Sequence, residues 1–408
     1  MRYRDFLDLG YRPRESDVVC RFHLEPGDLP LEEAAGAVAA ESSIGTWTEL
    51  RTLKPYMVEL RARVFEMEGQ AISVAYPLEL FEPGNLSNLL SSVAGNIFGM
   101  SAISRLKLLD IMLPEALLRS YPGPRYGIEG VRNLLGIRGR PLVGTIIKPK
   151  LGLNVQDHAR VAYEAWRGGC DIVKDDENLA DQGFNPFEDR VIETLEMRDR
   201  AEEETGERKA YLVNITAETG EMLRRAEYVE DHGGRYVMID ILTTGFAALQ
   251  TLRKADLKLA LHGHRAGHAA FTRPRRHGIA MRVIAKLARF AGIDQLHVGT
   301  AVGKMAEPRE RVLENVEALK TPMGRLKPAL PVASGGLHPG LVPELLKIFG
   351  PDVIIQAGGG VHGHPGGTEA GARAMRQAVE AALEGIPLKE YAKGRPELAA
   401  ALERWSRP

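Results

Sequence analysis

The sequence predicts an α/β protein built on a (β/α)8 TIM barrel, preceded by a small α+β domain. Three observations support this class. From about residue 140 onward, short apolar runs alternate with amphipathic segments at helical spacing. The eight runs occupy roughly the 250 residues of a typical barrel. Polar residues gather at the carboxyl ends of these runs, where barrels form their active sites.

The first part of the chain, residues 1–135, is expected to form the α+β domain. Residues 17–26 (DVVCRFHLEP) and 57–67 (MVELRARVFEM) are typical of strands. Residues 31–42 (LEEAAGAVAAES) and 85–99 (NLSNLLSSVAGNIFG) are typical of helices. These elements differ from the strand–helix alternation that follows.

Residues 136–408 are expected to form the barrel and the C-terminal helices. The strands are predicted at LVGTIIKP from 142, DIVKDDE from 171, YLVNITA from 211, YVMIDIL from 236, KLALHGHR from 258, DQLHVGT from 294, LPVASGG from 330 and VIIQAGGG from 353. Helices are predicted between them, for example at 157–169, 187–206 and 279–292, and at the end of the chain at 367–385 and 397–405. An open, doubly wound sheet is the alternative for the same alternation.

Composition narrows the class of function. The 408 residues carry 53 basic and 54 acidic side chains, a net charge of −1, so no overall field attracts nucleic acid or an anionic membrane. The two cysteines, Cys20 and Cys170, cannot form a disulfide framework, which fits a reducing compartment. No apolar run approaches the roughly 18 residues of a membrane span, and the N-terminus lacks a signal-peptide core. We therefore expect a cytoplasmic protein.

Two glycine-rich turns, residues 334–336 (SGG) and 358–360 (GGG), follow the last two predicted strands. Glycines let backbone N–H groups approach an anion closely, and barrels often bind phosphate at these two loops. Arg265 and His297, with Lys304 nearby in sequence, form a second basic group. Two such sites predict a small substrate that is charged at both ends. For His297 taken alone, a hydrogen-bonded core histidine is the simpler interpretation.

The stretch GGCDIVKDDEN (168–178) places a lysine among acids at the end of a buried strand. Asp176 and Glu177 supply the hard oxygen ligands that Mg²⁺ prefers. A salt-bridged Lys174 is the simplest interpretation. The other is a carbamate, formed when the neutral amine adds CO2, which would make Lys174 a third oxygen ligand beside Asp176 and Glu177.

Several motifs together resemble the large subunit of ribulose-1,5-bisphosphate carboxylase/oxygenase (RuBisCO). They are GTIIKPKLGL (144–153), GGCDIVKDDEN (168–178), HGHRAGHAA (262–270), HVGTAVGK (297–304), VASGG (332–336), QAGGG (356–360), AAESSIGTWTEL (39–50) and AGNIFGM (94–100). EEETGERKAYLVNITA and GVHGHPGGTEAGARAMRQA are most similar to the archaeal form III branch. The resemblance spans nearly the whole chain.

The resemblance implies a role for each matching residue. Carbamylated Lys174 would bind Mg²⁺ with Asp176 and Glu177. The expected catalytic residues are Lys148 and Lys150 in proton transfer, His264 at the substrate hydroxyls, Lys304 at the new carboxylate, Glu41 positioning Lys304, and Asn96 near the metal. The expected phosphate and sugar contacts are Thr46, Trp47, Arg265, His297, Ser334, Gly335, Gly336, Gly358 and Gly359.

The same resemblance implies an activity and an assembly. Enolisation of ribulose bisphosphate followed by CO2 addition would give two molecules of 3-phosphoglycerate, with O2 competing in an oxygenase reaction. Residues of the small domain complete the site of a partner subunit in this family, so a homodimer, or an assembly of dimers, is expected.

Other functions fit parts of the sequence. RuBisCO-like enolases, isomerases and decarboxylases share the barrel and the enolisation step. Carboxylases usually continue with Glu-Gly after the lysine at position 304, whereas this chain has Met305-Ala306-Glu307-Pro308, and the span 307–329 is short. A zinc hydrolase could use the His-x-His pair His262 and His264, and a non-catalytic scaffold is the third alternative.

Overall fold

A computed structural model describes residues 1–303 and 307–405, which form two compact units. The first unit consists of Met1–Gly123, Gly267–Ala291 and Thr321–Leu326. The second unit is the rest of the described chain, beginning at Pro124. The chain therefore returns twice to the first unit after it has entered the second.

The first unit contains a five-stranded sheet in the order β10-β4-β1-β3-β2. The central strand β1 pairs antiparallel with both β3 and β4, and β10 extends the edge in parallel with β4. The strands are β1 (Val18–Pro26), β2 (Arg63–Glu68), β3 (Ala71–Tyr76), β4 (Ile103–Met112) and β10 (Gly278–Ile279). Helix α1 (Leu31–Glu41) confirms the helix predicted over 31–42. The helix predicted over 85–99 is confirmed in its first half as α2 (Leu86–Val93), whereas Asn96–Gly99 form a separate 3-10 helix.

The strand predicted over 57–67 is wrong in its first half. Residues Pro55–Leu60 form a 3-10 helix, and β2 begins only at Arg63. Pro55 lies in the first turn of this helix, where the fixed φ of proline fits and its missing N–H is not needed. The proline therefore favours a helical turn over the apolar pattern that suggested a strand.

The second unit is the predicted barrel. Eight parallel strands close on themselves in the order β11-β12-β13-β5-β6-β7-β8-β9, and β9 pairs with β11 to complete the ring. This closure excludes the open doubly wound sheet. The strands are β5 (Leu142–Ile146), β6 (Ile172–Lys174), β7 (Ala210–Asn214), β8 (Tyr236–Asp240), β9 (Ala260–His264), β11 (Gln295–His297), β12 (Leu330–Ser334) and β13 (Ile354–Gln356).

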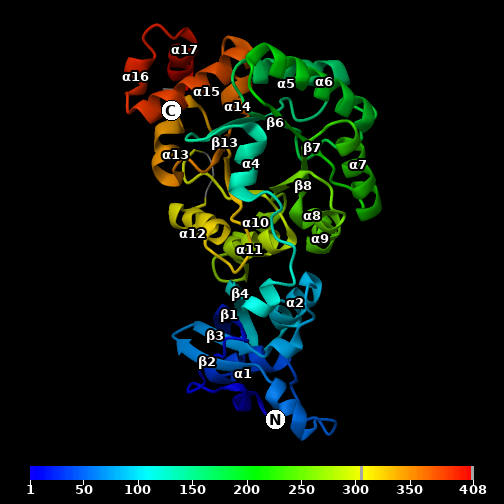
Figure 1. Ribbon diagram of the computed structural model, residues 1–408. Helices are drawn as coiled ribbons and strands as arrows, with labels where there is room; N and C mark the ends of the chain where they lie inside the picture. Colours follow the sequence, from blue (N-terminus) through cyan, green and yellow to red (C-terminus); the bar gives the residue numbers. More distant parts are fainter. Residues whose placement is uncertain (304–306, 406–408) are drawn as a thin grey trace. The chain divides into compact units, whose positions relative to one another are not determined.

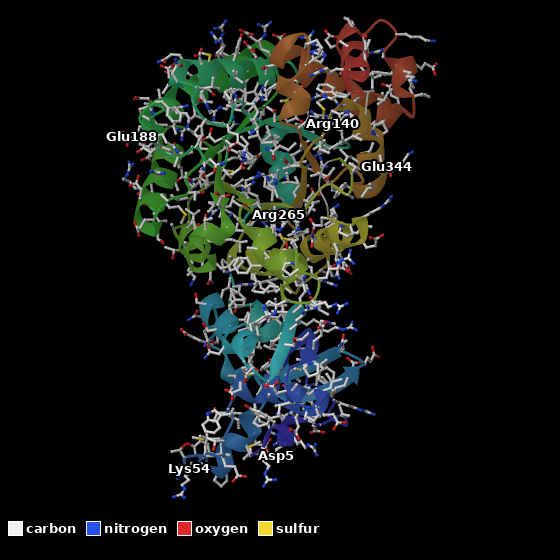
Figure 2. The ribbon with its side chains drawn as sticks, turned by 180° about the vertical axis from the view of Figure 1, so that it is seen from behind. Asp5, Lys54, Arg140, Glu188, Arg265 and Glu344 are labelled. Atoms are coloured by element: carbon white, nitrogen blue, oxygen red, sulfur yellow. The ribbon has the colours of Figure 1, made fainter. Side chains whose placement is uncertain are left out.

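Helices surround these strands in Figure 1. They include α5 (Val155–Arg167), α6 (Phe187–Thr205), α7 (Thr219–Asp231), α9 (Phe246–Lys254), α13 (Val342–Phe349) and α15 (Gly367–Glu384). Asn154 begins α5, where its side chain accepts a hydrogen bond from Asp157 N, and Gly206 ends α6 in the left-handed conformation. Glu188 and Glu344 lie exposed on α6 and α13, whereas Arg265 is buried in the barrel unit (Figure 2).

The amino end of the barrel is filled by an apolar cluster. Helix α4 (Gly127–Leu135) contributes Ile128, Val131 and Leu135, which pack with the first residues of the strands. The strand residues in this cluster include Leu142, Ile172, Ala210, Tyr236, Ala260, Leu330 and Ile354. The carboxyl ends of the same strands carry the polar groups described below.

The chain ends in helices, as predicted. Helix α15 is followed by α17 (Pro396–Trp405). In the described part of the chain, no helix combines the length and the apolar character that crossing a membrane requires.

Candidate active site at the carboxyl ends of the barrel strands

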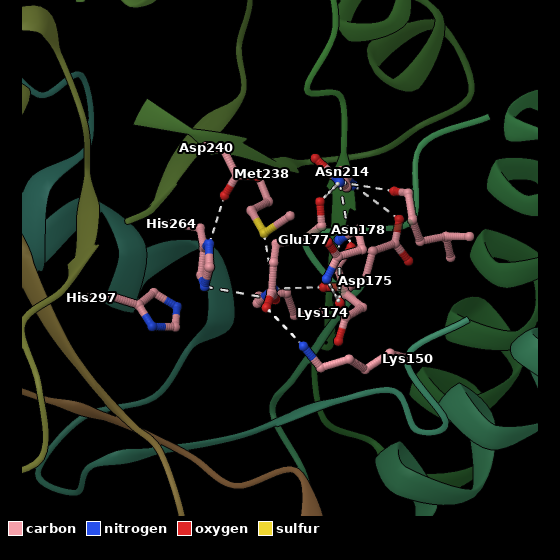
Figure 3. Close-up of polar contacts among 12 residues, drawn as sticks. Lys150, Lys174, Asp175, Glu177, Asn178, Asn214, Met238, Asp240, His264 and His297 are labelled. Carbon is pink, nitrogen blue, oxygen red and sulfur yellow. Dashed lines mark hydrogen bonds and ion pairs between the residues drawn. The ribbon is translucent and has the colours of Figure 1, made fainter. Parts of the chain in front are cut away.

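Strand β6 delivers Lys174 into the interior of the barrel, where its side chain is fully buried. Its Nζ donates a hydrogen bond to Asp175 O at 2.7 Å and lies 3.0 Å from Met238 Sδ and 3.6 Å from Glu177 Oε2 (Figure 3). Burial lowers the pKa of the Lys174 ammonium, against the attraction of Glu177 and Asp176. The amine is therefore nearer to its neutral form than an exposed lysine.

The two carboxylates that follow Lys174 and Asp175 belong to the same cluster. Asp176 is buried and accepts a hydrogen bond from Lys148 Nζ at 2.6 Å on one oxygen and from Asn178 on the other. Glu177 makes longer ion pairs, with Lys150 Nζ at 3.5 Å and with Lys174 Nζ at 3.6 Å. Burial alone would raise the pKa of Glu177, but the charges around it, that of Lys174 first, lower it to about 2.

Asp175 lies between these groups in sequence, but its side chain has a different environment. It is fully buried and is held by Tyr211 Oη at 2.7 Å, His158 Nε2 at 3.0 Å and the Asn214 backbone N–H at 3.0 Å, with Arg190 3.4 Å away. Burial opposes ionisation, yet these partners, Arg190 first, lower the pKa of Asp175 to about 2. Asp175 is a satisfied structural carboxylate and is not free to bind a ligand.

Asn214, at the end of β7, holds the backbone of residues 176–179. Its side-chain amide donates to three backbone carbonyls of that segment, those of Asp176, Glu177 and Leu179, at 3.4, 3.1 and 2.8 Å. Asn214 was not assigned a role from the sequence. Its side chain fixes the path of the segment, so the carboxylates are held in place by the fold.

Three histidines line the neighbouring strand ends. His264 Nδ1 lies 2.6 Å from Asp240 Oδ1, and its Nε2 is 3.7 Å from Glu177 Oε2. His262 Nε2 and His297 Nε2 are 2.8 Å apart. Burial lowers the pKa values of His262 and His297 well below the usual value, so both rings are neutral. The hydrogen bond with Asp240 orients the His264 ring. This contact was not predicted from the sequence.

Arg265 is buried beside these histidines, and its partner was missed by sequence analysis. Arg265 Nη2 donates to Glu307 Oε2 at 3.0 Å, and Asn315 Nδ2 donates to Glu307 Oε1 at 2.9 Å. Among the described residues, the buried Nη1 of Arg265 has no hydrogen-bond partner. This N–H can donate a hydrogen bond to a bound anion. Lys304, predicted to act nearby, lies outside the described residues.

The two glycine-rich turns follow β12 and β13. Gly335 and Gly336 adopt φ values of +130° and +69°, which other residues rarely adopt. At Gly358, a Cβ atom would lie 3.2 Å from Lys148 Cε, so this turn packs closely against a proposed catalytic lysine. Ser334 ends β12, and Gly359 begins α14 (Gly359–His362).

Four predicted site residues lie in the first unit. Glu41, at the end of α1, accepts a hydrogen bond from Tyr3 Oη at 3.0 Å. Burial and this contact raise the pKa of Tyr3 to about 12. Trp47 is 81% exposed, Thr46 is half-buried and Asn96 is exposed. Their proposed roles depend on a partner subunit.

Within the second unit, the structure brings together six of the predicted residues: Lys148, Lys150, Lys174, Asp176, Glu177 and His264. His297 joins them through ring contact with His264, at 4.8 Å between centroids. No three His, Cys, Asp or Glu side chains of the described chain form a ready metal-binding group. His262 and His264 face His297 and Asp240 and do not converge as the zinc hydrolase alternative requires.

Comparison with known proteins gives the same assignment along the whole chain. Residues 127–405 match the family model of the ribulose bisphosphate carboxylase large chain, catalytic domain, and residues 5–117 match that of its N-terminal domain. A protein of Pyrococcus abyssi named ribulose bisphosphate carboxylase is 51% identical over 99% of this chain and 96% of its own length. One of the same name from Methanosarcina barkeri is 52% identical over 98% of this chain and 99% of its own.

Solved structures agree with the sequence relatives. An octameric ribulose-1,5-bisphosphate carboxylase/oxygenase from Pyrococcus horikoshii, in complex with sulfate, is 50% identical, covers 99% of this chain and 97% of its own, and has a TM-score of 0.96. A dimeric archaeal enzyme from Hyperthermus butylicus is 47% identical, covers 99% of both chains and has a TM-score of 0.92. The chain therefore belongs to the RuBisCO large-chain family, and the relatives named above are archaeal.

Proposed function

We propose that this chain catalyses the carboxylation of ribulose 1,5-bisphosphate, with the oxygenase reaction as its side reaction. The observation that carries this proposal is the buried Lys174 beside Asp176 and Glu177, with two further lysines reaching the same carboxylates. Relatives at about half identity are named ribulose bisphosphate carboxylase. A protein that merely needed charge balance would not require three lysines at one barrel mouth.

The donor set fits Mg²⁺ if Lys174 carries CO2 as a carbamate. The burial that lowers the pKa of Lys174 favours the neutral amine, which is the form that adds CO2. Asp176 and Glu177 would supply the other two oxygen ligands, and Glu177 Oε2 lies 3.6 Å from Lys174 Nζ. When bound, Mg²⁺ polarises a carbonyl oxygen of the substrate.

Lys148 and Lys150 are suited to hold and deliver protons. Lys148 Nζ is anchored on Asp176 at 2.6 Å and is 30% exposed, so substrate can reach it. Lys150 pairs with Glu177 at 3.5 Å and is more exposed. We assign Lys148 to proton transfer at the enolised carbons, with Lys150 tuning its charge.

His264 and the phosphate-binding groups orient the substrate. Because Asp240 accepts the Nδ1 proton of His264, Nε2 is presented toward Glu177 and the space above it, where a sugar hydroxyl would lie. One phosphate would be held by Arg265 and His297, and the other by Gly335, Gly336, Gly358 and Gly359, with Ser334 near the sugar. Lys304 is assigned to the new carboxylate by resemblance alone.

A homodimer completes this proposal. Glu41, Thr46, Trp47 and Asn96 would serve the site of a partner copy, and the 81% exposed Trp47 side chain fits a residue that another subunit covers. The solved relatives are a dimer and an octamer, consistent with assemblies of dimers. The free, buried thiols of Cys20 and Cys170 support the expected cytoplasmic location.

A RuBisCO-like enolase or isomerase is the second candidate. Met305-Ala306-Glu307-Pro308 replaces the usual continuation after position 304, and this sequence difference is the observation that favours it. Such an enzyme would enolise a related ketose phosphate without adding CO2.

The deciding experiment supplies purified protein with Mg²⁺, bicarbonate and ribulose bisphosphate and measures 3-phosphoglycerate. Product formation is the expected result. Absence of product, together with proton exchange on a methylthio-substituted ketose phosphate, would establish the RuBisCO-like function instead.

A further inference from the structure

A series of hydrogen bonds beside the glycine turn 358–360 connects Thr368, His362, Thr145 and the Ala357 carbonyl. None of the functional roles assigned above involves it. His362 is the last residue of α14, directly after the turn 358–360. Its Nε2 lies 3.0 Å from Thr145 Oγ1 on β5, and its Nδ1 lies 3.1 Å from Thr368 Oγ1. The ring therefore links β5 to the first turn of α15, and His362 and Thr145 are 217 positions apart in sequence.

The contacts of Thr145 determine the direction of each hydrogen bond. The fully buried Thr145 hydroxyl donates to Ala357 O at 2.7 Å, so its proton is already used. It accepts from His362 Nε2–H, and His362 Nδ1 then accepts from Thr368. The imidazole also has a hydrogen-bonding contact with the Ile146 backbone on the same strand. Burial lowers the pKa of His362 to about 4, so the ring is neutral at pH 7 and has the one N–H and one lone pair that this series of hydrogen bonds requires.

Two members of this hydrogen-bonded series, Ala357 and Thr145, precede proposed site residues in the sequence. Ala357 immediately precedes Gly358, and Thr145 is three residues before Lys148. A Cβ atom at Gly358 would be only 3.2 Å from Lys148 Cε, so the backbone of the turn rests against the stem of the lysine. The charge of Lys148 also contributes to lowering the pKa of His362.

We propose that His362 is a positioning residue that acts through Thr145 and Ala357 to seat the turn 358–360 against Lys148. The inference rests on the proposed function, because it joins a phosphate-binding turn to the lysine assigned to proton transfer. Displacing the turn would weaken phosphate binding and misplace Lys148 at once. A loss of the bridge should therefore change both KM and the rate of proton exchange.

The test compares three single variants. In His362→Leu the donor to Thr145 is lost, and in Thr145→Val the hydroxyl is lost while the imidazole remains. We expect each to raise the KM for ribulose bisphosphate about three- to tenfold, the factor that corresponds to one lost hydrogen bond, and to slow C3 proton exchange by a similar factor. In His362→Gln the side-chain amide can donate to Thr145 as Nε2–H does, so both quantities should stay within about twofold of wild type.

The matched control is His364→Leu. His364 has two hydrogen bonds, to Glu397 O at 2.9 Å and from Gly366 N at 2.9 Å, but none to β5. This variant should lose stability without a change in KM. If His364→Leu raised KM as much as His362→Leu, general loosening of α14 would explain both effects, and the inference would be wrong.

The double variant His362→Leu/Thr145→Val gives the decisive outcome. If the two residues act through one bridge, the double variant should be no worse than either single variant. Fully additive effects would overturn the inference. If His362→Leu does not fold, Thr145→Val against His362→Gln supplies the same comparison.

Failure of the proposed carboxylation can be distinguished from failure of the proposed positioning role of His362. Wild-type protein without 3-phosphoglycerate formation contradicts carboxylation but leaves the bridge testable, because binding of inorganic phosphate can be measured by calorimetry without turnover. Weaker phosphate binding in His362→Leu and Thr145→Val, but not in His362→Gln, would then support the positioning role. Equal binding in all four proteins would refute it.

Discussion

The carboxylates of the barrel differ in how fully they are hydrogen-bonded, and the contrast is sharpest between Asp171 and Asp294 at the amino ends and Glu177 at the carboxyl ends. At the amino ends, Asp171 accepts two hydrogen bonds from Arg140, at 2.7 and 2.8 Å, and another from Val143 N, and Asp294 accepts from Arg253 and from Leu261 N. At the carboxyl ends, the half-buried Glu177 lies 3.5 to 3.7 Å from the side-chain nitrogens of Lys150, Lys174 and His264. Saturated carboxylates stabilise the ring, whereas an incompletely satisfied one remains available for a ligand.

Buried lysines show the same contrast. Lys174 at the mouth and Lys209 just before β7 are both buried. Lys209 Nζ, however, donates hydrogen bonds to Cys170 O at 3.2 Å and to Glu207 Oε2 at 2.8 Å. Burial therefore does not identify a functional lysine. The surroundings identify it, because Lys174 lies beside two carboxylates that also pair with Lys148 and Lys150.

The largest expected effect comes from Lys174→Met. It should lower carboxylation by at least about 10³-fold, because metal-assisted catalysis contributes several kcal/mol. The free energy of unfolding should stay constant or rise, since a buried cation is removed. The steady-state rate of 3-phosphoglycerate formation and denaturant unfolding are the measurements.

Lys209→Met is the matched control for that variant. It removes a lysine of equal burial from the other end of the barrel and should leave the activity of each folded molecule unchanged. Equal loss of activity in both variants would contradict the division between the two ends.

Asp294→Ala should have the largest effect on stability. It leaves Arg253 buried without its counter-ion and removes the acceptor for Tyr126 N and Gly127 N, so we expect a loss of about 3–5 kcal/mol. Urea unfolding measures it. A loss below about 1 kcal/mol would show that the amino end does not depend on this carboxylate.

Asp240→Asn should have a moderate effect that is confined to the mouth. The amide no longer stabilises the Nδ1–H tautomer of His264, and outer partners of this kind are typically worth about 10- to 100-fold. The expected change is in kcat, with little change in the thermal midpoint. A variant with unchanged kcat would remove His264 from the proposed machinery.

The smallest effect is a pH dependence that separates the two ends. His262 and His297 have folded pKa values well below the usual one, so they contribute stability that is present above the unfolded pKa and lost as pH falls below it. Unfolding free energy should fall below about pH 6.5, by up to about 1.4 kcal/mol per pH unit for each histidine. His262→Gln should flatten this slope, and Asp294→Ala should not.

Sequence reasoning recovered the barrel because each strand is a continuous apolar run, buried on both faces. In the first unit it found β1 and part of β2 but missed β3, β4 and β10. Strand β4 has register shifts against β1 that interrupt alternation, and β10 has only two residues. In the site, Lys174, Asp176 and Glu177 were predictable because they are neighbours in the chain. Glu307 and His362 were not, because their partners are 42 and 217 positions away.

The edge strand β10 has a consequence for how the chain is made. The sheet of the first unit is complete only when Gly278 and Ile279 pair with Lys107 and Leu108, and the same unit also includes residues up to Leu326. The ribosome must therefore synthesise most of the barrel before the sheet of the first unit has all five strands. Until then β4 exposes an unpaired edge, and a nascent chain stalled before residue 278 should be prone to aggregation.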